Sequence, residues 1–153
     1  MAVCGRLGWA AAGLAALARG FRSPRAAVDA HRLPQVPYGQ GRRAADAGAT
    51  AMIDISDGLI AEAGHLATSS GVAIDVHREA FEVPEPLHAV GAALGADPLE
   101  FILGGGDDHA LLATFPSIEV VPDGWAVVGE VLAGEGVTVD GADYDGPTGW
   151  THF

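Results

Sequence analysis

The segment Ala49-Thr-Ala-Met-Ile-Asp-Ile-Ser-Asp-Gly-Leu59 contains the features from which the fold is predicted. Ala49–Ile55 is a short apolar run with Asp54 near its end, which is typical of a buried strand. Ser56-Asp57-Gly58 has the residue types of a turn that begins a helix. The following stretch, Leu59–Ser69, is predicted to be a helix with one apolar stripe, made of Leu59, Ala63, Leu66 and Ala67.

Short strands and helices alternate along the rest of the chain. Further helices are predicted over Leu7–Leu17, from Ser23-Pro24 onward, and over Arg42–Gly48, Leu87–Leu94 and Pro98–Leu103. Further strands are predicted over Val72–Val76, His109–Phe115, Trp125–Val131 and Gly136–Val139. This alternation predicts an α+β domain in which a sheet is layered with helices, as in an α/β/α sandwich.

The length of 153 residues predicts a single domain over residues 1–153. Charge is divided unevenly between its two parts. Residues 1–50 hold seven arginines and two aspartates, a net charge of +5, whereas residues 51–153 hold one arginine and eighteen acids, a net charge of −17. Such an acidic chain is a poor general binder of nucleic acid, because phosphate neutralisation needs clustered cations. The acids are a solvated surface or, in part, a cation site.

The N-terminal region indicates the cellular compartment in which the protein is expected. Cys4 is the one cysteine, which excludes an internal disulfide and a cysteine-built zinc site and fits a reducing cytoplasm. The apolar run Leu7–Ala18 is too short to span a bilayer and lacks a clear cleavage site, so we interpret it as a helix of a soluble domain. Cys4 has no base near it in the sequence and is expected to be buried and inert.

Two motifs have residues suited to phosphate chemistry. In the first, Asp54 and Ser56 share a side of the strand and Asp57 projects from the turn, where a helix N-terminus favours a phosphate. Carboxylates and a hydroxyl are ligands that Mg²⁺ takes together with substrate phosphates. The alternative is helix capping by Ser56 or Asp57. In the second, Gly104-Gly-Gly-Asp-Asp108, the glycines allow close backbone approach to a ligand, or form a turn with two solvated acids.

The C-terminus carries Trp150, His152 and Phe153. These aromatic side chains anchor the terminus to the core or offer a stacking surface for a flat heteroaromatic ligand.

Six motifs in this order resemble the C-terminal half of the thiamine-monophosphate kinases, which belong to the aminoimidazole-ribonucleotide-synthetase superfamily. The resemblance runs from Cys4 to Phe153. Its marks are Gly5–Leu14, Met52–Leu59 with His65, Ser70–Val72, Gly105–Asp108, Gly129-Glu130 and Gly149–Phe153.

The resemblance implies Mg²⁺-dependent transfer of a phosphoryl group from ATP to thiamine monophosphate, giving thiamine diphosphate. It implies Asp54 and Asp57 as Mg²⁺ ligands and Ser56 as an ATP contact. Asp107 and Trp150 would contact the thiamine substrate. No catalytic side chain is assigned, because phosphoryl transfer depends on positioning and charge neutralisation.

The chain departs from the family pattern at two acids and in its extent. Asp107 and Glu62 stand where Glu and Asp, respectively, are usual in the family. The family's N-terminal half, with most of its ATP site, is absent from these residues. We therefore expect a fragment, a truncated frame or an isolated domain that does not catalyse alone, and that pairs with the missing half or as a homodimer.

Two other functions stay open at this stage. One is a different ATP-dependent synthetase of the same superfamily, against which the ending Gly149–Phe153 argues. The other is a non-catalytic binding or dimerisation module that retains the fold.

Overall fold

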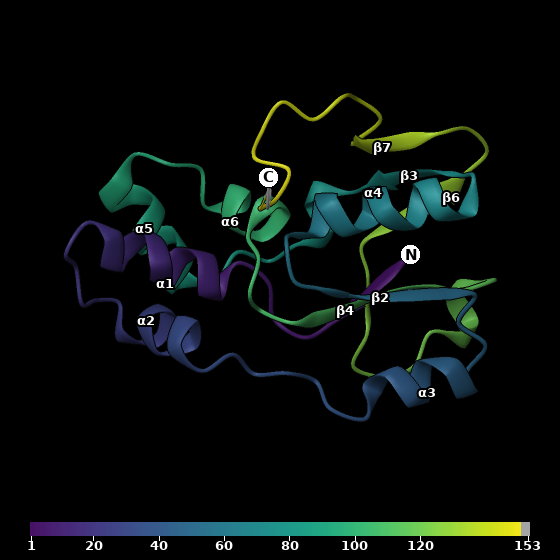
Figure 1. Ribbon diagram of the computed structural model, residues 1–153, viewed down its shortest axis with the longest axis horizontal. Helices are drawn as coiled ribbons and strands as arrows, with labels where there is room; N and C mark the ends of the chain where they lie inside the picture. The colour runs from purple at the N-terminus through teal and green to yellow at the C-terminus, as the bar shows by residue number, and fades with distance from the viewer. Residues whose placement is uncertain (151–153) are drawn as a thin grey trace.

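The computed structural model describes residues 1–150 and has the predicted α+β class (Figure 1). The helices are α1 (Trp9–Ala18), α2 (Arg25–Arg32), α3 (Gln40–Asp46), α4 (Leu59–Ser70), α5 (Glu85–Leu94) and α6 (Pro98–Gly104). The strands are β1 (Ala2–Cys4), β2 (Ala51–Ile55), β3 (Ala73–Val76), β4 (Ala110–Thr114), β5 (Ala126–Val127), β6 (Gly129–Leu132) and β7 (Gly136–Val139). Two short 3₁₀ turns cover Arg78–Ala80 and Ile118–Val120.

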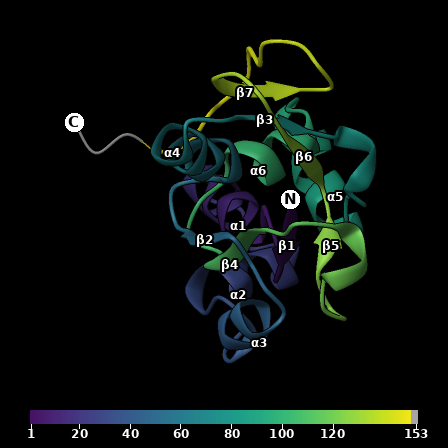
Figure 2. The ribbon, with the colours of Figure 1, turned by 90° about the vertical axis from the view of Figure 1, so that its right-hand side faces the viewer.

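The strands form two sheets rather than the single sheet expected from the sequence. The first has the order β2-β4-β1-β5 and is antiparallel throughout, and the second has the order β6-β3-β7 with β3 and β7 parallel. The predicted strand Trp125–Val131 divides at Val128. Its first part, β5, pairs with β1, and its second part, β6, pairs with β3 in the other sheet (Figure 2).

Helix α4 joins the two sheets. It packs against β2 and β4 of the first sheet and against β3 and β7 of the second. All four residues of its predicted apolar stripe are buried, together with Ile55 and Leu112 of the first sheet and Ile74 and Val76 of the second. Because burial of apolar surface is the main favourable term in folding, this continuous core holds the two sheets together.

Strand β1 was not predicted, because Ala2–Cys4 is too short to show an alternating pattern. It lies between β4 and β5 and is buried along its length. Cys4 is buried, as predicted, and burial raises the pKa of its thiol despite the opposing charge of Arg43. A raised thiol pKa means little reactive thiolate at neutral pH.

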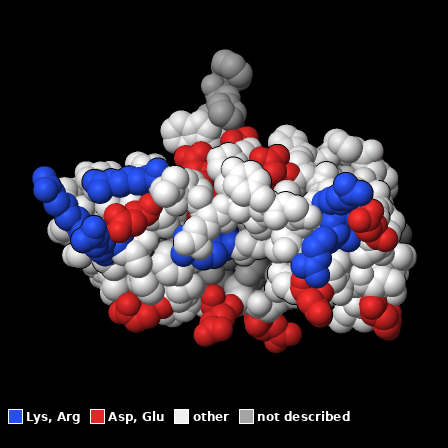
Figure 3. Space-filling view, turned by 90° about the horizontal axis from the view of Figure 1, so that it is seen from below, with Lys and Arg blue, Asp and Glu red and all other residues white. Residues whose placement is uncertain are grey.

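The predicted N-terminal helix is present as the ten-residue α1. Within residues 1–150, no helix has the length and apolar character needed to cross a membrane. The arginines of the first third form separate groups with acidic side chains among them, as the view of the lower face shows (Figure 3). Two of these arginines form exposed ion pairs one helical turn apart, Arg25 with Asp29 and Arg42 with Asp46.

Helices α1 and α2 pack so closely that α1 needs a glycine at the contact. A Cβ on Gly13 would lie 2.1 Å from the carbonyl oxygen of Ala27, whereas a Cβ on Gly64 in α4 would meet no atom within 4 Å. We expect Gly13→Ala to lower the free energy of unfolding by about 1–3 kcal/mol through overpacking. Gly64→Ala is the matched control and should raise it by about 0.5–1 kcal/mol, because alanine favours the helix. Urea denaturation of both variants measures the difference, and equal effects at the two sites would contradict the packing argument.

Candidate functional site

A pocket of about 510 Å³ lies where three chain segments meet beside α1. The segments are the turn after β2, the glycine-rich loop after α6 and the last described residues of the chain. Its walls are mostly apolar, from the small side chains of α1 and the ring of Phe101, and acidic side chains lie among them. The lining residues are Ala10, Ala11, Leu14, Ala15, Ser56, Asp57, Glu100, Phe101, Gly104, Gly105, Gly106, Asp107, Pro147, Gly149 and Trp150.

The pocket brings together four of the five residues singled out from the sequence. Ser56, Asp57, Asp107 and Trp150 all line it, although they come from segments about 50 and 40 residues apart in the chain. The indole of Trp150 is 68% exposed, so it forms an open wall rather than part of the core. Residues 151–153 lie outside the described residues, so the predictions for the aromatic side chains of His152 and Phe153 also lie outside them.

Asp54 does not line this pocket. Its carboxylate is exposed, and its Oδ2 atom lies 3.6 Å from Nδ1 of His109. His109 directly precedes β4, the strand that pairs with β2. The strand ends at Ile55, so the alternation that would put Asp54 and Ser56 on one side does not continue into the turn. Within residues 1–150, neither Asp54 nor Asp57 belongs to a cluster of three potential metal ligands.

Backbone hydrogen bonds hold the three segments together. The N–H of Asp107 donates to the carbonyl of Ser56 at 2.8 Å, and the N–H of Trp150 donates to the carbonyl of Asp57 at 2.9 Å. Each bond joins the backbone of the turn at Ser56–Asp57 to the backbone of another segment. The position of Asp107 and Trp150 at the pocket therefore depends on the turn at Ser56–Asp57.

Glycine makes this close approach possible. A Cβ on Gly106 would lie 2.3 Å from the carbonyl oxygen of Ser56, and one on Gly104 would lie 2.1 Å from that of Pro147. Gly58 has φ of 140°, which L side chains rarely adopt, and its Cβ would meet the carbonyl oxygen of Gly104 at 2.8 Å. In this structure, protein backbone makes the close approach that the glycine run allows.

A side chain of α4 stabilises the turn at Ser56–Asp57, and neither of these residues caps the helix. The N-cap of α4 is Gly58, and neither of the proposed capping residues fills that role. Instead the buried Glu62 accepts hydrogen bonds from the Ser56 hydroxyl and from the N–H of Asp57, each at 3.3 Å. Glu62 therefore fixes the two residues that line the pocket. The sequence gives only a weak indication of this, namely an acid in the first turns of the helix.

Asp107 and Asp108 point to different surroundings, and the interpretation of both as solvated acids or ligands is wrong for Asp108. Asp107 has φ of 64°, which turns the chain so that Asp107 is exposed at the pocket and Asp108 is only 4% exposed. Asp108 Oδ1 accepts the N–H of Ala10 at 3.0 Å and so caps α1 from 98 residues away. The N-cap residue of α1 is Gly8, which has no side chain to cap the helix, and this is the one sequence signal for a remote cap.

Burial raises the pKa of Asp108 to about 6, against the opposing hydrogen bonds from the N–H groups of Ala10, Gly8 and Trp9 and the charge of Arg6. Desolvation outweighs these donors because the carboxylate loses nearly all its water.

A scan against models of protein families found no match. Along its whole length, the chain is 45% identical to the thiamine-monophosphate kinase of Mycobacterium tuberculosis, of which it covers 46%. The solved structure titled AaThiL complexed with AMPPCP and TMP superposes with a TM-score of 0.88 at 36% identity, covering 99% of this chain and 50% of that one. A thiamine monophosphate kinase structure from Aquifex aeolicus superposes with a TM-score of 0.83 at 34% identity. The match covers 94% of this chain and 50% of that one. The chain thus spans about half the length of the curated relatives it matches.

The raised pKa of Asp108 predicts a specific pH dependence of stability. The folded state binds this proton more tightly than the unfolded state, whose carboxyl has the ordinary value of 3.8. The contribution of Asp108 to stability is therefore largest below pH 3.8 and falls, by up to about 3 kcal/mol, as the pH rises through about 6.

We expect Asp108→Asn to lose this pH-dependent contribution to the free energy of unfolding, although its amide oxygen still accepts the Ala10 N–H. Urea denaturation between pH 4 and 7, compared with the wild type, isolates the difference. Asp123→Asn removes an exposed acid in a turn and should keep the wild-type profile. Parallel profiles of Asp108→Asn and wild type would show that Asp108 does not titrate in this range.

Proposed function

The chain is a homologue of the C-terminal half of the thiamine-monophosphate kinases, and on this premise we propose that its pocket binds thiamine monophosphate for phosphorylation by ATP. The observation that supports the proposal best is the convergence of Ser56, Asp57, Asp107 and Trp150 on one pocket. Their motifs are those through which the sequence resembles this family. The similar AaThiL structure is a complex with AMPPCP and TMP.

The chemistry of the pocket suits the thiamine part of the substrate. Thiamine joins two flat heteroaromatic rings, one of them a cationic thiazolium. The alanines of α1 and the rings of Phe101 and Trp150 offer apolar surface against which such rings can pack. Asp57, Glu100 and Asp107 supply negative charge, and none of the lining residues is basic. An acidic, aromatic-walled pocket attracts a cationic ring.

We assign the phosphate end of the reaction to the turn after β2. Ser56 would contact ATP, with its hydroxyl oriented by Glu62. Asp57 and Asp54 would hold Mg²⁺, since their carboxylate oxygens are hard ligands and Asp54 is exposed to solvent. Bound Mg²⁺ supplies charge neutralisation at the phosphate oxygens. The chain's own residues position the substrate and hold the turn in place.

The residues at 1–153 form a single C-terminal-type domain in this proposal, and the full reaction needs the rest of the kinase. The coverage of about half of each relative supports this division. The partner would be the family's N-terminal half, within one subunit or across a homodimer.

Binding of thiamine monophosphate is the first test. Calorimetry with Mg²⁺ and the nonhydrolysable analogue AMPPCP present should detect binding to the wild-type chain. Trp150→Ala should weaken it at least tenfold by removing the exposed indole from the wall. Tyr38→Ala removes an aromatic side chain that is 87% exposed and does not line the pocket, so it should bind as the wild type does. Absence of binding to the wild type, or equal binding by Trp150→Ala, would favour a non-catalytic module instead.

The second test varies the length and charge of the side chain at position 107. Asp107 is one methylene shorter than the glutamate usual in the family, so its carboxylate reaches less far into the pocket. We expect Asp107→Glu to bind thiamine monophosphate at least as tightly as the wild type, and Asp107→Asn to bind more weakly because it lacks the charge. The same calorimetric titration measures both, and tighter binding by Asp107→Asn would contradict a role for its charge.

Turnover is the third test. A coupled assay for thiamine diphosphate should show no activity above background for these 153 residues alone. Adding a separately produced N-terminal half of a related kinase should restore activity if the two halves associate. Ordinary rates from the chain alone would overturn the proposed division of the enzyme.

A further inference from the structure

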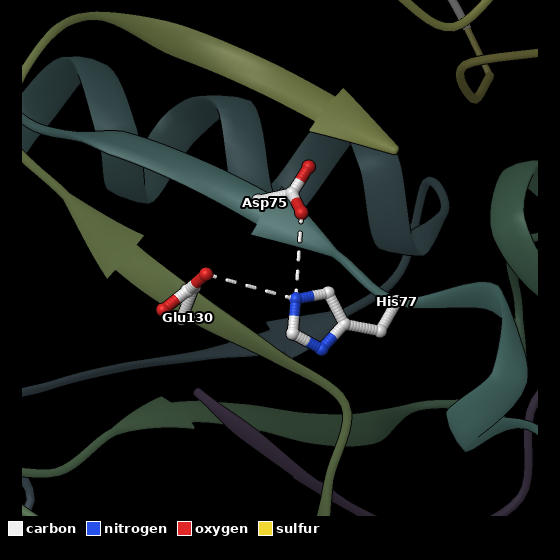
Figure 4. A group of neighbouring side chains, drawn as sticks. All are labelled: Asp75, His77 and Glu130. Atoms are coloured by element: carbon white, nitrogen blue, oxygen red, sulfur yellow. Dashed lines mark ion pairs between the residues drawn. The ribbon is translucent and has the colours of Figure 1, made fainter. Parts of the chain in front are cut away.

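A group of potential metal ligands lies on the second sheet, away from the pocket. Asp75 on β3 is directly opposite Glu130 on β6, and His77 follows at the end of β3. One ligand atom from each of these residues lies within 4.8 Å of the other two. Figure 4 shows both carboxylates directed toward the same imidazole nitrogen. None of the three residues lines the pocket described above.

Asp75 is held in place by contacts that leave one oxygen for the cluster. Its Oδ1 accepts hydrogen bonds from the Thr138 hydroxyl and from the N–H of Gly141, the latter at 2.8 Å. Its Oδ2 lies 3.4 Å from Nε2 of His77. Metal-binding carboxylates are commonly oriented in this way by hydrogen bonds from outside the site. Asp75 is 7% exposed, so its direction is set by the fold.

The distances lie in the range of ion pairs between His77 and the two carboxylates, and they also suit metal ligation. Nε2 of His77 is 3.4 Å from Asp75 and 3.9 Å from Glu130, both longer than the usual hydrogen-bond range of about 2.7–3.2 Å. Two ligands of a tetrahedral zinc, each about 2.0–2.1 Å from the metal, are about 3.3 Å apart. Glu130 has an exposed side chain and can move the remaining few tenths of an ångström.

The ligand types indicate the kind of metal. Imidazole nitrogen with carboxylate oxygens suits Zn²⁺ and similar transition ions, whereas Mg²⁺ prefers oxygen ligands in an octahedral arrangement. Two carboxylates also balance the charge of a divalent cation. The cluster runs from buried Asp75 to exposed Glu130, so an ion can enter and water can complete its coordination.

We propose that Asp75, His77 and Glu130 bind a transition-metal dication of the zinc class, which fastens β6 and the segment after β3 to β3. The site is structural and separate from the Mg²⁺ expected at the turn after β2. Binding to the folded state alone stabilises it. The segments it joins include the point where the chain passes from β5 in the first sheet to β6 in the second.

Zinc titration of the metal-free chain tests the proposal. The protein is treated with chelator, carries no histidine tag, and is titrated calorimetrically with Zn²⁺ alone; Co²⁺ absorption reports the coordination. We expect one equivalent to bind, with the intense visible bands of a tetrahedral site. At a hundredfold excess over the dissociation constant, Zn²⁺ should raise the melting temperature by about 5–10 °C.

Variants of the two more exposed ligands locate the site without disturbing Asp75. His77→Gln and Glu130→Gln should each weaken Zn²⁺ binding at least tenfold and so reduce the melting shift by about half or more at the same Zn²⁺ concentration. His88→Gln on α5 and Glu135→Gln in the β6–β7 turn are matched controls that should bind like the wild type. Failure of the wild type to bind Zn²⁺, unchanged binding by both ligand variants, or equally tight binding of Mg²⁺ would overturn the proposal. These outcomes do not depend on thiamine monophosphate binding at the pocket.

Discussion

Direct contact between backbones, at the glycine run after α6, is the constraint on which the site depends. Gly104 and Gly106 lie against Pro147 and Ser56 at distances that no Cβ would allow. Because these segments touch without side chains between them, the turn after β2, the loop after α6 and the C-terminal segment form one rigid unit. The side chains that leave this unit, Asp57, Asp107 and Trp150, therefore converge on the same pocket.

Buried acids play a second organising part in a chain with many carboxylates. Among residues 1–150 the buried acids are Glu62, Asp75 and Asp108. Each accepts hydrogen bonds from donors in another segment: the turn at Ser56–Asp57 for Glu62, β7 and the loop after it for Asp75, and the start of α1 for Asp108. A carboxylate leaves water at high cost unless donors replace it, so each buried acid also defines a specific contact. The acidic residues of the second part of the chain are therefore not all at the surface, since these three are buried in contacts between segments.

Local patterns predicted the elements well where the pattern was long enough. The strand that ends at Ile55, the apolar stripe of α4 and the C-terminal ends of α4 and α5, each predicted to within one residue, follow from apolar spacing. β1 was missed because three residues show no periodicity, and the strand at Trp125–Val131 was not divided because its apolar run continues through Val128. Which sheet each half joins depends on partners far away in the chain.

The sequence by itself determined the α+β class, the family resemblance and four residues of the pocket, Ser56, Asp57, Asp107 and Trp150, because these follow from residue types at short spacing. Only the tertiary structure decided that Asp54 faces His109 outside the pocket, that Asp108 caps α1 and that Asp75, His77 and Glu130 form a cluster. The physical reason is that side-chain surroundings depend on contacts between segments distant in the chain. Adjacent acids such as Asp107 and Asp108 look alike in sequence, yet one turn of the backbone leaves the first in solvent and buries the second.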